Sequence, residues 1–166
     1  MKQEVFADLL DANRAYAESF RLRGLEPRAA KGLAVLTCMD SRIEPLGMLG
    51  LVPGDAKILR NAGARVTPDV VRTLVLGVHL LGVERVLVIP HTKCGTLGDQ
   101  DEIKTKIAAS GGPSAIDVDL LTTTDQQSTL RADVERLRAE ALLGDITVGG
   151  AVYDVDTGLL TPLTDA

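Results

Sequence analysis

Short, mostly apolar runs alternate with longer amphipathic segments along this chain. Four of these runs have the length of short strands, at residues 33–37, 57–60, 85–90 and 146–153. Residues 68–82 instead carry apolar side chains at spacings of three and four, which predicts a helix that begins at Pro68 and ends at Gly82. Buried strands that alternate with helices predict a parallel sheet with helices on both faces.

The remaining segments complete one α/β domain over residues 1–166. Three further helices are expected, over residues 3–22, 99–109 and 130–141. A turn ending at Gly158 precedes Leu159-Leu160, which predicts a last short strand that pairs antiparallel. The predicted fold is therefore a mostly parallel four-stranded central sheet flanked by helices, with a short antiparallel C-terminal edge strand and a helical arm over residues 1–25.

The N-terminal helix holds most of the aromatic side chains. Three of the four aromatic residues of the chain are Phe6, Tyr16 and Phe20. A helix of this kind either packs on its own domain or lies as an arm across a partner subunit, and the pattern does not separate the two.

Composition excludes several classes of function. The formal net charge of -5 and the aromatic content of 2% argue against a nucleic-acid interface. No apolar run reaches the roughly 18 residues of a membrane span, and the first residues lack the apolar segment of a secretory signal. A cytoplasmic protein is expected, in which a cysteine pair favours metal binding or catalysis over a disulfide.

Both cysteines of the chain, and one of its two histidines, follow predicted strands. Cys38 comes directly after the first strand, and His91 and Cys94 follow the third. In parallel sheets ligands bind beyond the carboxyl ends of the strands, so the three side chains would meet there if the two strands are neighbours. Two thiolates and an imidazole suit a catalytic zinc site with one open position. The alternative is two cysteines that act as small buried hydrophobes and a hydrogen-bonded loop histidine.

Asp40 and Arg42 raise the specificity of this pattern. Their spacing lets both side chains project to one side of the turn after Cys38. Asp40 would be either a fourth ligand or a hydrogen-bond acceptor for metal-bound water, and Arg42 would hold its carboxylate in a bidentate pair. An ordinary surface ion pair is the alternative.

These motifs together resemble one enzyme family. Cys38-x-Asp40-Ser41-Arg42, followed by His91-x-x-Cys94-Gly95, is similar to the zinc motifs of the β-class carbonic anhydrases, and the chain looks like their compact bacterial branch. Residues 60–63 resemble the loop that follows the second strand of that family, and residues 153–159 resemble its C-terminal hairpin.

The resemblance implies a zinc enzyme that interconverts carbon dioxide with bicarbonate and a proton. Cys38, His91 and Cys94 would hold Zn²⁺. Asp40 and Arg42 would act in catalysis: Asp40 would accept a hydrogen bond from the attacking group, and Arg42 would hold Asp40 away from the metal. In a closed state Asp40 would itself become the fourth ligand. The family also implies a homodimer or dimer of dimers, with the arm embracing the partner.

Two other functions remain open from the sequence. Enzymes that resemble this family hydrolyse carbonyl sulfide or carbon disulfide with the same ligands. A non-catalytic protein with a structural zinc is the second alternative. Two thiolates would make the zinc site formally neutral before hydroxide binds, so an alkaline activity profile is expected for the enzyme.

Five residues besides the candidate ligands, Asp40 and Arg42 receive individual predictions. The aliphatic candidates for the wall of a carbon dioxide pocket are Val66 and Leu81. Arg65 and Lys93 are expected to be solvated loop charges. His79 lies within the helix over residues 68–82 and is expected to be a packed or surface histidine rather than a proton shuttle.

Overall fold

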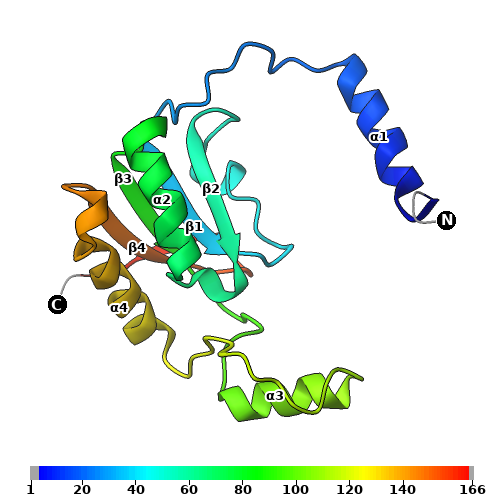
Figure 1. The fold of residues 1–166 in the computed structure, drawn as a ribbon, viewed down its shortest axis with the longest axis vertical. Coiled ribbons are helices and arrows are strands. Elements are labelled where there is room, and N and C mark those ends of the chain that lie inside the picture. Colours follow the sequence, from blue (N-terminus) through cyan, green and yellow to red (C-terminus); the bar gives the residue numbers. More distant parts are fainter. Residues whose placement is uncertain (1–3, 165–166) are drawn as a thin grey trace.

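The computed structural model describes residues 4–164 and contains one mixed sheet with four α-helices (Figure 1). The strands are β1 Leu33–Cys38, β2 Ala56–Asn61, β3 Arg85–Ile89, β4 Thr147–Tyr153 and β5 Leu160–Pro162. The α-helices are α1 Ala7–Glu18, α2 Pro68–Leu81, α3 Gln100–Ala109 and α4 Gln126–Arg138. Short 3₁₀ segments lie at η1 Glu4–Phe6, η2 Gly47–Leu49, η3 Ala62–Ala64 and η4 Ala141–Leu143.

The strands lie in the order β2-β1-β3-β4-β5. The first four are parallel, and β5 pairs antiparallel with β4. The predicted fold class is therefore confirmed. The register places Thr37 opposite Ile89, so the carboxyl ends of β1 and β3 lie side by side.

Both helices of the core lie on one face of the sheet. Val70 and Leu74 of α2, and Leu130 and Val134 of α4, pack in one cluster with strand residues such as Leu36. The cluster on the opposite face has no member from an α-helix among residues 4–164; its cover comes from the η2 segment and the β4–β5 hairpin. The expectation of helices on both faces is wrong for the single chain, because the connection from β1 to β2 contains a 3₁₀ turn and no α-helix.

Local capping explains where the core helices begin and end. Thr67 accepts a hydrogen bond from the Val70 amide at the start of α2, and Gly82 ends that helix with a φ of 71°. Asp125 caps α4 through the Ser128 amide. The helix therefore begins at Gln126, before the apolar stripe that predicted its start at residue 130.

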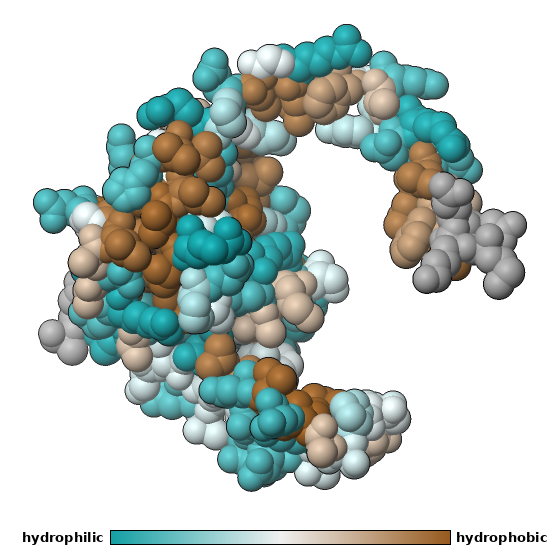
Figure 2. All heavy atoms as spheres, in the orientation of Figure 1, coloured by the Kyte–Doolittle hydropathy of each residue, from teal (hydrophilic) through white to brown (hydrophobic). Residues whose placement is uncertain are grey.

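The arm and α3 extend from the body of the molecule (Figure 1). Among the residues described, none of α1 or α3 is buried. Figure 2 shows hydrophobic residues exposed along the arm, and its exposed apolar residues include Phe6, Leu9 and Leu10. In this chain α1 thus does not pack on its own sheet. No helix within residues 4–164 is both long and apolar enough to cross a membrane.

Candidate metal centre

The carboxyl ends of β1 and β3 bring the two cysteines and His91 together. Cys38 is the last residue of β1, and His91 follows β3 by two residues. All three side chains are buried, and one potential ligand atom from each lies within 4.8 Å of the others. The condition set by the sequence, that the two strands be neighbours, is met.

The two sulfur atoms are close but not bonded. Their separation is 3.9 Å, and both cysteines are free. Each sulfur also has a second polar contact: the Gly63 amide donates to Cys38 Sγ at 3.3 Å, and Thr96 Oγ1 lies 3.1 Å from Cys94 Sγ. Burial raises the pKa of the Cys38 thiol, with a smaller contribution from Cys94 in the same direction, against the lowering effect of the Gly63 and Asp40 amides.

The His91 ring presents one nitrogen to the sulfurs and uses the other to fix its orientation. Nδ1 lies 2.8 Å from the Thr92 carbonyl oxygen, so it carries the proton and donates it there. The lone pair is therefore on Nε2. That atom is buried and lacks a hydrogen-bond partner among the described residues.

These observations fit a tetrahedral zinc ion. Two Zn–S bonds of about 2.3 Å at a tetrahedral angle separate the sulfurs by about 3.8 Å, and the distance here is 3.9 Å. A cation would also give the orphaned His91 Nε2 a partner. It would favour the thiolate form that burial of Cys38 opposes.

Asp40 is held toward Arg42. The guanidinium donates from Nε to Asp40 Oδ1 at 2.9 Å and from Nη2 to Oδ2 at 2.7 Å, and the Arg42 amide adds a third bond at 2.9 Å. Asp40 Oδ2 lies 3.7 Å from His91 Nε2, so the carboxylate borders the candidate ligand group. Hydrogen bonds from Arg42 hold the pKa of the Asp40 carboxyl well below its usual range, and this keeps it ionised.

Known proteins resemble this chain in sequence and in fold. The carbonic anhydrase family matches residues 33–119. β-Carbonic anhydrase 1 of Mycobacterium tuberculosis is 32% identical over 165 residues, which cover 95% of this chain and 96% of the relative. The chain belongs to the β-carbonic anhydrase family.

Two further relatives extend the comparison. The crystal structure of a carbonic anhydrase from Streptococcus mutans superposes with a TM-score of 0.87 and 38% identity, over 96% of this chain and 97% of that one. A carbon disulfide hydrolase of Acidianus sp. is 31% identical over 173 residues, which cover 85% of this chain and 84% of the relative. Membership in the family makes the chain an enzyme, and the two kinds of relatives leave its substrate open.

Two residues that support this β-carbonic anhydrase site were not singled out by sequence reasoning. Arg60 lies one residue before the end of β2 and donates to the carbonyl oxygens of Cys38 and Asp40 at 2.9 and 2.6 Å. Gln126 donates from Nε2 to the His91 carbonyl oxygen at 2.8 Å. The only sequence feature that pointed to Arg60 was its position in the segment that resembles a family loop. No sequence feature pointed to Gln126, because its partner His91 is 35 residues away in the chain.

The structure corrects the expectation for Arg65. Its guanidinium is partly buried and pairs with Asp133 of α4 at 2.7 Å, and it also donates to the Leu121 carbonyl oxygen at 2.6 Å. Arg65 therefore connects three segments of the chain from a partly buried position and is not a solvated charge. Lys93 is exposed as expected, and it pairs with Asp156 at 2.5 Å.

The other individual predictions have mixed outcomes. His79 lies on the surface of α2 with Nε2 at 2.8 Å from the Leu142 carbonyl oxygen, as expected of a helix histidine. Val66 is buried in the core cluster between the sheet and the helices. Leu81 ends α2, four residues before β3 begins, and thus lies toward the amino ends of the strands. Neither side chain is placed to line the wall of a pocket at the site.

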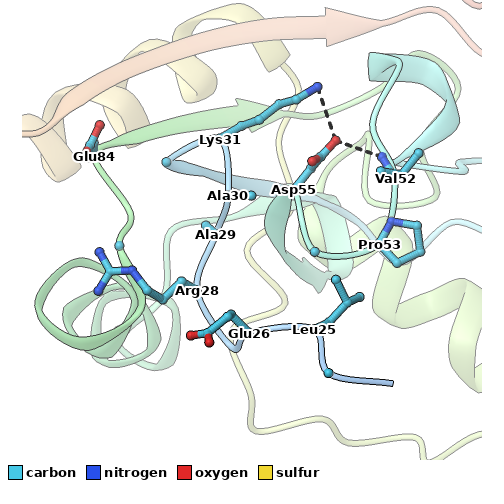
Figure 3. Close-up of a pocket in the computed structure, with 14 residues that line it drawn as sticks. Leu25, Glu26, Arg28, Ala29, Ala30, Lys31, Val52, Pro53, Asp55 and Glu84 are labelled. Atoms are coloured by element: carbon cyan, nitrogen blue, oxygen red, sulfur yellow. Dashed lines mark hydrogen bonds and ion pairs between the residues drawn. The ribbon is translucent and has the colours of Figure 1, made fainter. Parts of the chain in front are cut away.

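A separate hollow lies at the other end of the sheet, beside the amino ends of its strands (Figure 3). It is lined by residues 24–26, 28–32 and 52–55 with Gly82 and Glu84, just before β1, β2 and β3 begin. Its Lys31 and Asp55 already pair with each other at 3.2 Å. The hollow is therefore remote from the cysteines, and its charges do not form a second metal site.

Proposed function

We propose that this protein is a zinc-dependent carbonic anhydrase, which hydrates carbon dioxide reversibly to bicarbonate and a proton. The observation that carries the proposal is the buried Cys38, His91 and Cys94 group, whose orphaned Nε2 lies beside the Asp40–Arg42 pair. Family membership and the similarity to β-carbonic anhydrase 1 support it.

The three ligands and the Asp40–Arg42 ion pair have different roles. Cys38, His91 and Cys94 hold the zinc, which when bound lowers the pKa of water from 15.7 toward about 7 and so supplies hydroxide near neutral pH. The Asp40 carboxylate accepts a hydrogen bond from the attacking group and orients its lone pair toward carbon dioxide. Arg42 keeps Asp40 ionised and turned away from the sulfurs, through the bidentate pair.

Arg42 also connects the two halves of the site. Its Nη2 donates to the Lys93 carbonyl oxygen at 3.1 Å, between His91 and Cys94 in the chain. The same guanidinium therefore fixes Asp40, which follows β1, relative to the two ligands that follow β3. Loss of Arg42 would free the carboxylate to approach the metal position.

Hydrolysis of carbon disulfide or carbonyl sulfide is the second candidate function. A carbon disulfide hydrolase is about as similar to this chain as β-carbonic anhydrase 1 is, at 31% and 32% identity. A purely structural zinc is disfavoured, because Asp40 is bound to Arg42 and does not close the ligand group.

Stopped-flow measurement of carbon dioxide hydration on zinc-quantified protein tests the proposal. We expect activity to rise with pH and to reach its plateau on the alkaline side, because two thiolates leave less positive charge to acidify water. Asp40→Ala should lose most of this activity. Glu135→Gln, which removes a carboxylate paired with Arg138 on the surface of α4, should not. A parallel assay follows sulfide release from carbon disulfide and carbonyl sulfide.

The outcomes separate the candidates. Background hydration of carbon dioxide together with sulfide release would replace the main proposal with the second. Zinc-loaded protein that is inactive on every substrate and at every pH would favour the structural role. A plateau already reached below neutral pH would contradict the charge argument.

We also infer that the protein works as a homodimer, alone or paired into a tetramer, in which the arm lies across the partner. The arm carries exposed apolar side chains, among them Phe6, Leu9, Leu10 and Tyr16. None of α1 is buried within the described chain. Exposed apolar surface of this extent is typical of protein–protein contacts.

A further inference from the structure

Each sulfur of the candidate metal centre has a hydrogen-bonding neighbour of its own. For Cys38 Sγ it is the Gly63 amide, at 3.3 Å. For Cys94 Sγ it is the side-chain hydroxyl of Thr96, at 3.1 Å. The Thr96 contact comes from a side chain, so it can be removed by substitution without changing the backbone.

The direction of the Thr96 hydrogen bond follows from the state of the sulfur. A cysteine ligand binds zinc as a thiolate, which has no proton to give. The hydroxyl must then be the donor and Cys94 Sγ the acceptor. Hydrogen bonds to a charged acceptor are stronger than those between neutral groups, so this contact would hold a metal-bound Cys94 sulfur firmly toward Thr96.

The backbone around Thr96 holds the hydroxyl in place. The Thr96 carbonyl oxygen accepts from the Thr123 amide at 3.2 Å, and the Leu97 amide donates to the Cys94 carbonyl oxygen at 3.1 Å. The loop that carries Thr96 is thereby tied both to residue 123 and to Cys94 itself. Thr96 is partly buried and does not need to reach across solvent.

Gly63 provides the space for this hydroxyl. A Cβ atom at residue 63 would lie only 2.8 Å from Thr96 Oγ1. Because Gly63 has no side chain, its backbone can lie close to the Thr96 hydroxyl. The Gly63 amide and the Thr96 hydroxyl thus reach the two sulfurs from neighbouring positions.

We propose that Thr96 is a positioning residue of the metal centre, whose hydroxyl donates to the Cys94 ligand and limits the electron density that this sulfur gives to the metal. The inference rests on the proposed metal site and assigns a role to a residue outside the ligand and Asp–Arg motifs. Removal of the hydroxyl should weaken metal binding, because no side-chain contact then holds Cys94 Sγ in place before the metal arrives. It should also make Cys94 a stronger electron donor in the metal-bound protein.

The test compares wild type with Thr96→Val, which keeps the shape of the side chain, and Thr96→Ser, which keeps the hydroxyl. Zinc affinity is measured by competition with a chelator, and the sulfur-to-metal charge-transfer band is measured after substitution with Co²⁺. Thr96→Val should lower zinc affinity by about 10-fold and move the band to longer wavelength, because the sulfur electrons are less stabilised. Thr96→Ser should stay close to wild type.

A control removes a hydroxyl elsewhere. Thr105→Val acts on α3, where Thr105 Oγ1 donates to the Asp101 carbonyl oxygen on an exposed surface. It should change neither the zinc affinity nor the band. Circular dichroism of all four proteins checks that each is folded.

The results distinguish failure of this inference from failure of the metal site. If wild type shows no thiolate charge-transfer band with Co²⁺, the proposed metal site itself is wrong. If the band is present and Thr96→Val leaves both it and the affinity unchanged, only the role of Thr96 is overturned. Equal losses in Thr96→Val and Thr96→Ser would also overturn it, because the hydroxyl would then not be the group that acts.

Discussion

Single side chains decide how charge is distributed beside the metal centre. Asp40 is ionised because three hydrogen bonds from Arg42 stabilise its carboxylate, and His91 Nε2 lies 3.7 Å from Oδ2 of the same group. Since the pKa of Asp40 is lowered in the folded chain, the pair stabilises the fold above the unfolded pKa of about 3.9. That contribution is lost as pH falls below this value.

Substitution of Arg42 should return Asp40 to an ordinary carboxyl. Arg42→Met removes the largest cause of the lowered pKa and keeps only the backbone amide bond, so the pKa of Asp40 should rise toward its usual value of about 3.9. The carboxyl ¹³C chemical shift of Asp40 in metal-free protein, followed from pH 6 down to pH 3, measures this. Lys93→Met is the control, because Lys93 is a nearby cation that pairs with Asp156. A titration that is the same in wild type and Arg42→Met would contradict the assignment.

Substitution of Arg65 should test the buried pair that the sequence did not indicate. Arg65→Met leaves the buried Asp133 carboxylate without its cation, which should cost about 3 kcal/mol of unfolding free energy. Chemical denaturation at one fixed protein concentration measures this. Arg72→Met breaks an exposed pair with Asp69 and should cost less than about 1 kcal/mol. Adding Asp133→Leu to Arg65→Met should recover most of the loss, and no recovery would show that the pair is not its source.

The Asp40–Arg42 and Arg65–Asp133 ion pairs show when a sequence pattern can predict a contact between side chains. Asp40 and Arg42 are two residues apart, so local spacing was enough to predict their contact. Arg65 and Asp133 are 68 residues apart and meet only because α4 packs beside the loop after β2. Nothing local to Arg65 distinguishes it from a solvated charge. The ligands were predictable for a different reason: scarce cysteine and histidine residues follow two apolar strands.

At the scale of elements, strands were easier to predict than the segments that join them. Mostly apolar runs identified β1, β3 and β4, because strands that are largely buried on both faces carry few polar side chains. The side of the sheet on which a helix packs depends on the connections, and that information is not contained in periodicity. The start of α4 was placed late, since its first turn is polar and is fixed by the Asp125 cap.

The loop after β2 is the connection on which the metal centre depends most. Gly63 has a φ of 76°, and its amide donates to Cys38 Sγ. Gly63→Ala should therefore destabilise the chain by about 1–2 kcal/mol from the left-handed backbone alone. It should also reduce zinc content, because the added Cβ would collide with Thr96 Oγ1 at 2.8 Å.

Gly95→Ala is the matched control for this loop. It adds the same methyl group one residue after Cys94, at a position with nothing within 4 Å. Thermal unfolding and zinc analysis of both variants separate general strain from the specific contact. Equal stability and equal zinc content in the two variants would show that the geometry of Gly63 is not required.

At the scale of the whole molecule, the arm extends away from the sheet, and none of α1 is buried in the single chain (Figure 1). Leu9 and Tyr16 lie on one side of α1, and Asp11 and Glu18 lie on the other. Two interpretations were left open by the sequence, and the arrangement in Figure 1 favours contact with a second copy. Sequence periodicity identifies an apolar face but does not identify what covers it.

One charge placed on that apolar face should weaken the dimer. Leu9 is 61% exposed in the single chain, so Leu9→Glu should not disturb the domain itself. In a dimer the same carboxylate would be buried against apolar surface, which opposes association. Ala15→Glu is the control, because it adds an identical charge on the side of the helix that carries Asp11 and Glu18. Sedimentation velocity over a range of concentrations should show a dimer for wild type and Ala15→Glu, and a shift toward monomer for Leu9→Glu. Monomeric wild type, or a Leu9→Glu protein as dimeric as its control, would show that the arm does not hold two copies together.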